Sequence, residues 1–176
     1  MSNRTKLWIA EAMRQLMTQK SLDKIRVTEI CQIANIERPT FYYHFKDKYD
    51  LVSWIFFNTI TNTNILSTES IAKNLATMKQ DFLFYKRAYE DTSQTPLWKY
   101  MFDYFVAKYT QKAQELLATS NLNQELQFDI RFYCYGCVGI SREWLLFDKN
   151  TSAEVIAQRY FNAMPVSLRT IFFKDS

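Results

Sequence analysis

ERPTFYYHFKDK, residues 37–48, is the stretch that decides the fold. Four ring-bearing residues run together from Phe41 to His44, behind an Arg-Pro pair, and a fifth ring follows at Phe45. Side chains four positions apart share a helix face, so Phe41 and Phe45 can both pack inward. The outward side chains would then be polar, with Tyr42 at the flank: Arg38, Thr40, Tyr43 and His44. We therefore expect a short helix that is anchored by two rings and presents polar groups.

The rings alone fit an aromatic core equally well, and the flanking sequence separates the two interpretations. A short helix is expected over about 27–34, with Ile30, Ile33 and Ala34 inward. Asn35 then favours a turn, because Asn tolerates the left-handed region at a helix C-terminus. Pro39 falls in the first turn of the next helix, about 38–45, where proline is tolerated. Two short helices joined by a tight turn outline a helix-turn-helix.

Long helices are expected in the rest of the chain. Its 176 residues include only two glycines and three prolines, far fewer than strands joined by tight turns need. The fold class is therefore all-α, with a hydrophobic content of 48% that allows a real core. Pro165 should interrupt the last helix near Met164. The remaining helices are expected at about 4–19, 48–65, 69–91, 96–118, 123–147 and 152–173.

The charge distribution indicates a polyanion as partner. The net charge is +4, and residues 1–50 hold nine Lys/Arg against six Asp/Glu, which places +3 of it in the first third. No apolar run is long enough to span a bilayer. The N-terminal segment has the pattern of an amphipathic helix and not of a secretory signal. Three cysteines without an export signal are typical of a reduced, cytoplasmic protein.

Cys134 and Cys137 form a C-x-x-C motif, CYGC, in the middle of an expected helix. The redox form of this motif follows a strand, and a zinc site needs further Cys or His nearby. We therefore expect neither a redox centre nor a metal. Gly136 and Gly139 are the only glycines of the chain, and each costs about 1 kcal/mol in a helix. Close approach of another helix is the expected compensation.

No arrangement of residues indicates an enzyme or a cofactor. His44 is the only histidine, and no His–carboxylate or Ser-His pair is visible. Rings between residues 82 and 105 could line a ligand pocket, although a core role is the commoner one for each ring. The candidates for such a pocket are Tyr85, Tyr89, Trp98 and Phe102.

Residues 27–56, VTEICQIANIERPTFYYHFKDKYDLVSWIF, resemble the DNA-binding domain of the TetR family of transcriptional regulators. The T-F-Y-x-H-F-x-x-K pattern at 40–48 carries the likeness, which covers about 5–60. The resemblance implies a three-helix DNA-binding domain over 1–50 with a linking helix behind it. It also implies a helical domain over 51–176 that dimerises and often binds a small effector. This second domain is similar to the shorter type found in Gram-positive bacteria.

The resemblance also implies which residues touch DNA. The family's DNA-contacting positions correspond here to Thr28, Arg38, Pro39, Thr40, Tyr42, Tyr43 and His44, with Lys48 on phosphate. Arg26 and Lys46 are basic neighbours that can reach phosphates too. Arg26 stands where the family usually has a Ser or Thr cap, which weakens that cap by about 1 kcal/mol. Glu37 replaces a common Ser, suits the helix dipole and would repel a nearby phosphate.

The expected activity is sequence-specific binding of a pseudo-palindromic operator by a homodimer, with repression as the expected effect. The family's architecture places the dimer interface on the last two long helices. There Gly136 and Gly139 would allow close approach, and Trp144 and Leu145 would supply apolar area. The alternative is a co-regulator that acts through protein contacts, such as a co-activator, with secondary DNA contacts.

Overall fold

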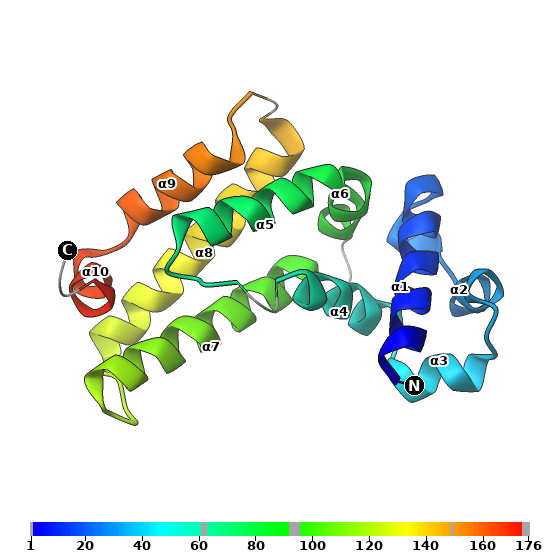
Figure 1. The fold of residues 1–176 in the computed structure, drawn as a ribbon, viewed down its shortest axis with the longest axis horizontal. Helices are drawn as coiled ribbons and strands as arrows, with labels where there is room; N and C mark the ends of the chain where they lie inside the picture. The colour runs from blue at the N-terminus through cyan, green and yellow to red at the C-terminus, as the bar shows by residue number, and fades with distance from the viewer. Residues whose placement is uncertain (1, 61–62, 92–95, 149, 174–176) are drawn as a thin grey trace. The chain divides into compact units, whose positions relative to one another are not determined.

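The computed structural model describes residues 2–60, 63–91, 96–148 and 150–173, and within these ranges the chain is helical without a strand. The all-α prediction is therefore confirmed (Figure 1). A single 3₁₀ turn, η1 (Leu22–Lys24), separates the first two α-helices. The α-helices are α1 (Ser2–Gln19), α2 (Val27–Ala34), α3 (Arg38–His44), α4 (Lys48–Ile60), α5 (Thr68–Gln80), α6 (Phe82–Glu90), α7 (Leu97–Leu117), α8 (Gln124–Phe147), α9 (Ala153–Ala163) and α10 (Val166–Phe172).

Two of the predicted long helices are interrupted. The helix expected over 69–91 is two helices, because Asp81 leaves the helical conformation with φ −98° and ψ 38°. Its carboxylate forms an ion pair with Arg14 of α1, an interaction between distant positions that sequence periodicity does not contain. The helix expected over 152–173 is also two helices, and here the predicted interruption at Pro165 is confirmed.

The chain divides into two compact units that interleave along the sequence. Unit 1 comprises residues 1–61 and 81–97, and unit 2 comprises residues 62–80 and 98–176. Helix α6 therefore belongs with α1–α4, whereas α5, which directly precedes it, belongs with α7–α10. The predicted domains divide the chain once, near residue 50, and that division by function stays a prediction.

Helix α1 is the centre of unit 1, where it contacts α2, α3, α4 and α6. Its apolar stripe of Ile9, Met13 and Met17 is completely buried. Tyr85 of α6 is also completely buried in this unit. The guanidinium carbon of Arg14 lies 4.9 Å from the Phe84 ring centroid, so a cation–π contact joins the ion pair between α1 and α6.

Unit 2 is built around α8, which contacts α5 and α10, while α5 packs along α9. Tyr109 of α7 meets Tyr133 of α8 edge to face, with ring centroids 5.5 Å apart. The hydroxyl of Tyr160 donates to the backbone carbonyl of Cys137 at 3.0 Å and lies 2.7 Å from the hydroxyl of Ser141. The polar atoms of this core are thus paired within it, which avoids the cost of unsatisfied buried groups.

The C-x-x-C motif lies in the middle of α8, as the structural interpretation predicts. Cys134 is buried, and neither it nor Cys137 is in a disulfide. Burial raises the pKa of the Cys137 thiol to about 12, and it raises the pKa of Cys134 as well. Both thiols are therefore protonated near neutral pH, the form that does not attack disulfides or electrophiles.

Native protein should leave Cys134 and Cys137 unlabelled by a thiol reagent such as DTNB at pH 8. Their raised pKa values and their place in the core both suppress the thiolate. The measurement is mass spectrometry of the labelled peptides, with protein unfolded in guanidinium as the positive control. Rapid labelling of either cysteine in the native state would contradict the structural role.

Candidate DNA-binding face

Helix α3 is a seven-residue helix whose start is set by backbone geometry. Glu37 precedes it in extended conformation, and its carbonyl accepts hydrogen bonds from the amides of Thr40 at 3.0 Å and Phe41 at 3.3 Å. Pro39 occupies the first turn, where no amide is needed. The amide of Phe45 closes the other end on the carbonyl of Phe41 at 2.9 Å.

The two faces of α3 differ sharply in exposure. Phe41 is completely buried and Phe45 is 2% exposed, which confirms that these two rings anchor the helix. Tyr43 is 81% exposed, and its ring meets that of His44 edge to face at 4.9 Å. Tyr42 is about half exposed. The helix therefore presents phenol, imidazole and guanidinium groups outward, as its spacing predicts.

The turn between α2 and α3 has the predicted form. Asn35 adopts the left-handed conformation, with φ 51° and ψ 51°, and the amide of Ile36 returns to the carbonyl of Cys31 at 3.0 Å. One inward prediction is wrong, because Ile33 is 41% exposed. On this short helix, Ile30 and Cys31 supply the buried face instead.

The start of α2 is stabilised by Glu29, a contribution that the prediction of a weak cap at Arg26 did not include. The amide of Arg26 donates to the carboxylate of Glu29 at 2.9 Å, which is half of a capping box. Lys20 pairs with the same carboxylate. Glu29 therefore offsets part of the missing Ser or Thr cap, and the side chain of Arg26 stays exposed.

The start of α4 is capped from both directions. The Oδ1 atom of Asp47 accepts from the amides of Tyr49 at 2.9 Å and Asp50 at 2.8 Å, which caps the helix N-terminus. The carboxylate of Asp50 accepts from the amide of Lys46 at 2.9 Å. These bonds fix the backbone just past α3 and leave the Lys46 side chain exposed.

The ammonium group of Lys48 forms its hydrogen bonds within the protein. Its ammonium donates to the carbonyls of Leu22, Asp23 and Ile25 at 2.7, 2.9 and 3.0 Å, which uses all three of its protons. Partial burial lowers its pKa. Lys48 thus ties the η1 turn to α4, and its predicted phosphate contact would have to compete with these three bonds.

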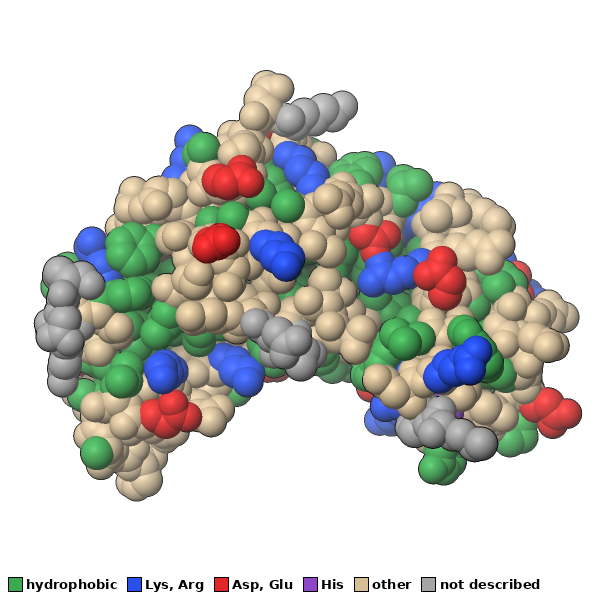
Figure 2. All heavy atoms as spheres, in the orientation of Figure 1, with side chains coloured by type: hydrophobic (Ala, Val, Ile, Leu, Met, Phe, Trp, Pro, Cys, Tyr) green, Lys and Arg blue, Asp and Glu red, His purple; other side chains and the backbone are tan. Residues whose placement is uncertain are grey.

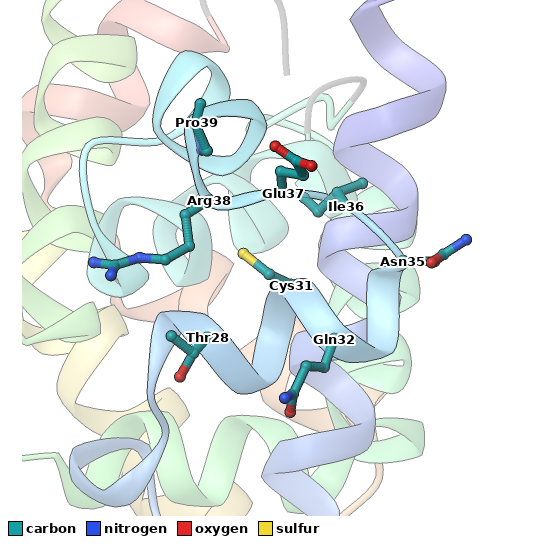
Figure 3. Close-up of a pocket in the computed structure, with 8 residues that line it drawn as sticks. All are labelled: Thr28, Cys31, Gln32, Asn35, Ile36, Glu37, Arg38 and Pro39. Carbon is teal, nitrogen blue, oxygen red and sulfur yellow. The ribbon is translucent and has the colours of Figure 1, made fainter.

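A crevice of about 620 Å³ between α2 and α3 brings several predicted residues together (Figure 3). Thr28 comes from α2, and Arg38 and Pro39 come from the start of α3. Gln32 also lines the crevice and was missed by the sequence analysis. It lies one turn after Thr28, so four-residue spacing on α2 could have identified it.

A lysine of α1 lies beside the end of α3. The ammonium of Lys6 is 5.6 Å from the ring centroid of Phe45 and 5.7 Å from that of Trp54. Lys6 could not be identified from local sequence patterns, because its neighbours are distant in the chain. On the face drawn in Figure 2, acidic and basic side chains are interspersed.

The expected interface and ligand residues have mixed surroundings. Trp144 is 2% exposed and Leu145 is 3% exposed, so neither supplies the exposed apolar area expected of it. The indole of Trp144 instead donates to the carbonyl of Thr151 at 2.9 Å. Gly136 and Gly139 are exposed, and a Cβ at either position would meet nothing within 4 Å.

The four candidate ligand rings are divided between the units. Tyr85 and Tyr89 are buried in unit 1, whereas Phe102 is buried in unit 2 with Trp98 packed against the same core cluster. These are the surroundings of core residues, and an effector pocket stays a prediction. Among the described residues, no three His, Cys, Asp or Glu side chains could jointly hold a metal ion. The helices in these ranges are also too short or too polar to span a membrane.

This helix-turn-helix with an outward polar face is that of a DNA-binding transcriptional regulator, and comparison with known proteins agrees. Residues 9–54 match the family described as bacterial regulatory proteins of the tetR family. Residues 67–165, more than half of the chain, match the family described as the transcriptional regulator C-terminal region. The chain belongs to the TetR family of transcriptional regulators.

Individual relatives share the fold or the N-terminal region. Over 50 residues the chain is 44% identical to the HTH-type dhaKLM operon transcriptional activator DhaS of Lactococcus lactis subsp. lactis (strain IL1403). That match spans 28% of this chain and 27% of the relative.

Two solved structures are similar along most of their length. The dihydroxyacetone kinase operon activator DhaS has a TM-score of 0.61 at 20% identity, covering 95% of this chain and 97% of that one. A TetR transcriptional regulator from Rhodococcus sp. RHA1 has a TM-score of 0.57 at 16% identity, covering 92% and 95%.

Replacing Lys48 with Met should lower the free energy of unfolding by about 1–3 kcal/mol, because three carbonyls lose a charged donor. Urea unfolding followed by circular dichroism measures the change. Lys46→Met, which removes a nearby exposed lysine whose side chain is not needed for the cap, should unfold like the wild type. Equal stability of the Lys48 variant and the wild type would show that the three bonds contribute nothing.

Proposed function

We propose that this protein is a homodimeric, sequence-specific DNA-binding regulator that recognises a pseudo-palindromic operator through α3. The observation that carries the proposal is the division of α3 into a buried face and an exposed polar one. A helix held by Phe41 and Phe45 can enter a major groove without giving up its packing. Phenol, hydroxyl and guanidinium groups can then donate to base edges or to phosphates.

The proposed contacts fall into two classes. We assign base-edge contacts to three residues on the exposed side of α3, namely Tyr43, Thr40 and Arg38. These contacts would give sequence preference. Arg26 and Lys46 flank that helix and are placed at phosphates, where they would give affinity without sequence preference. The remaining proposed contacts are Thr28, Pro39, Tyr42 and His44, with Lys48 limited by its bonds to the η1 turn.

Dimerisation is proposed because one short helix reads too few base pairs to distinguish a site in a genome. Two-fold symmetry doubles the contacts and sets the two α3 helices about 34 Å apart or slightly more, one turn of DNA. An isologous interface needs a surface patch that matches itself.

The proposed patch is the exposed face of α8. Its large apolar side chains follow helical spacing. Three of them, in the first half and middle of the helix, are aromatic rings that are each more than 60% exposed: Phe128, Phe132 and Tyr135. Gly136 and Gly139 lie among them with open space over their Cα atoms, which would let a second helix approach closely. Exposed rings around small residues are typical of interfaces between proteins. Ile140 and Phe147 extend the same patch.

The direction of regulation has two candidates. Repression is the expectation from the sequence, whereas activation is favoured by the name of the relative with the similar N-terminal region. The two can be distinguished with a reporter gene placed under a promoter that carries the operator. Reporter expression should fall in the presence of a repressor and rise in the presence of an activator. We place the regulator in the cytoplasm, where bacterial DNA is, and assign it no catalytic role and no cofactor. A small effector is left as a prediction without a defined pocket.

Tyr43→Ala and Thr40→Ala should each lower the preference for a duplex selected from a random pool over unrelated DNA, by about 1–3 kcal/mol per lost base contact. Lys46→Ala should weaken binding to all duplexes alike and flatten the dependence of log K on log salt by about one unit. Fluorescence anisotropy at several salt concentrations measures both effects. If all three variants bind as the wild type does, α3 is not the reading element.

Gly139→Leu should separate the dimer at micromolar concentration, because the added side chain overpacks the proposed interface by several kcal/mol, about 1–3 per protomer. Within one protomer the new Cβ meets no atom within 4 Å, so the fold itself should tolerate it. Sedimentation velocity measures the mass. Gln111→Leu adds a similar apolar side chain at an exposed position of α7 and should stay dimeric. A dimeric Gly139→Leu protein that still binds DNA tightly would remove α8 from the interface.

A further inference from the structure

Glu37 is the acidic residue at the point where the chain enters α3. It is exposed and stands at the N-cap position with φ −85° and ψ 156°. Its carboxylate makes no capping hydrogen bond to the helix amides, although an acid at this position could do so. The backbone carbonyl of Glu37 alone holds the first turn, through Thr40 and Phe41. The side chain is thus free for a partner outside the helix.

The surroundings of Glu37 place it within the proposed DNA-binding face. It lines the crevice between α2 and α3 together with Thr28, Gln32 and Arg38. In Figure 3 the side chains of Glu37 and Arg38 project away from each other. A duplex that contacts Thr28 on α2 and Arg38 on α3 would cover the crevice between them, and Glu37 would lose water there.

A carboxylate in that position has few acceptable partners on DNA. Phosphates repel it, and losing water without gaining a donor is costly. The major groove offers amino-group donors only on cytosine and adenine, and Glu accepts characteristically from the cytosine N4 amino group. Guanine presents two acceptors, N7 and O6, at its major-groove edge. Their partial negative charges would repel the carboxylate.

We propose that Glu37 determines base specificity by accepting a hydrogen bond from a cytosine N4 amino group, at one position in each half-site of the operator. This inference rests on the proposed function and refines it. Arg38 and Tyr43 would read neighbouring positions, and Glu37 would exclude guanine from its own.

The experiment is parallel selection from one random duplex pool by the wild type, Glu37→Gln and Glu37→Ala. Gln pairs with adenine through N6 and N7, so Glu37→Gln should change one position of each half-site from cytosine to adenine. Glu37→Ala should lose the preference at that position by about tenfold. All other positions of the motif should be retained by both variants.

Matched controls separate base reading from a general effect of charge. Glu11→Gln removes one negative charge from an exposed position of α1 in the same unit and should leave the motif unchanged. Thermal unfolding should differ only slightly between the wild type and Glu37→Gln, because the variant loses the attraction of the charge to the helix dipole but no hydrogen bond of the side chain to the helix. Binding to a duplex with the single cytosine replaced then quantifies the contact.

Two results would overturn the inference while leaving the proposed function intact. One is an unchanged motif with tighter binding to every duplex, which would mean that Glu37 only repels phosphates. The other is an unchanged motif with unchanged affinity, which would place Glu37 outside the interface. Failure of the wild type to enrich any motif would overturn the proposed function itself, and the inference with it.

Discussion

Burial of Phe41 and Phe45 is the interaction on which the DNA-binding face depends. A helix of seven residues cannot persist in water by itself, because too few hydrogen bonds offset the cost of starting it. Fully burying a Phe side chain contributes roughly 1.5–3 kcal/mol, so the two rings stabilise a helix that is too short to persist by itself. Trp54 of α4 packs edge to face on Phe45 at 5.7 Å, so the helix after α3 also holds it in place. The exposure of Tyr43 is a consequence of this anchoring on the opposite side.

Charged groups of the same unit hold the backbone around that helix. Glu29 caps α2, Asp47 caps α4, and Lys48 ties three carbonyls near η1 to the start of α4. In each case a charged side chain forms a hydrogen bond with a backbone amide or carbonyl. Such hydrogen bonds are stronger than those between two neutral groups. Chain ends that would otherwise fray are therefore fixed relative to α3. A regulator that reads base edges needs this rigidity, because a small displacement of the reading side chains removes their contacts.

Local patterns predicted the helix-turn-helix well, and distant contacts limited the rest. The turn at Asn35 and the interruption at Pro165 each follow from the conformational preference of one residue, and the anchoring rings follow from their four-residue spacing. The sequence displays both kinds of pattern directly. The break at Asp81 is accompanied by an ion pair with Arg14, and the hydrogen bonds of Lys48 go to carbonyls more than twenty residues away. The side of α8 that faces outward was misjudged for the same reason. Trp144 looks like interface area until its contact with Lys79 of α5 is known, whose ammonium lies 4.2 Å from the Trp144 ring centroid.

The interleaving of the two units limits how this chain can be divided. A fragment that ends near residue 60 contains α1–α4 but lacks α6, whose Phe84, Tyr85, Ala88 and Tyr89 are buried in unit 1. Such a fragment would expose the surface of α1 that these side chains cover, including the Arg14 guanidinium. Exchanging the DNA-binding helices α1–α4 between related regulators therefore requires more than joining two chains after α4. A compatible α6 has to be transferred together with α1–α4. The evolution of this segment in the middle of the chain is therefore tied to that of the N-terminal helices.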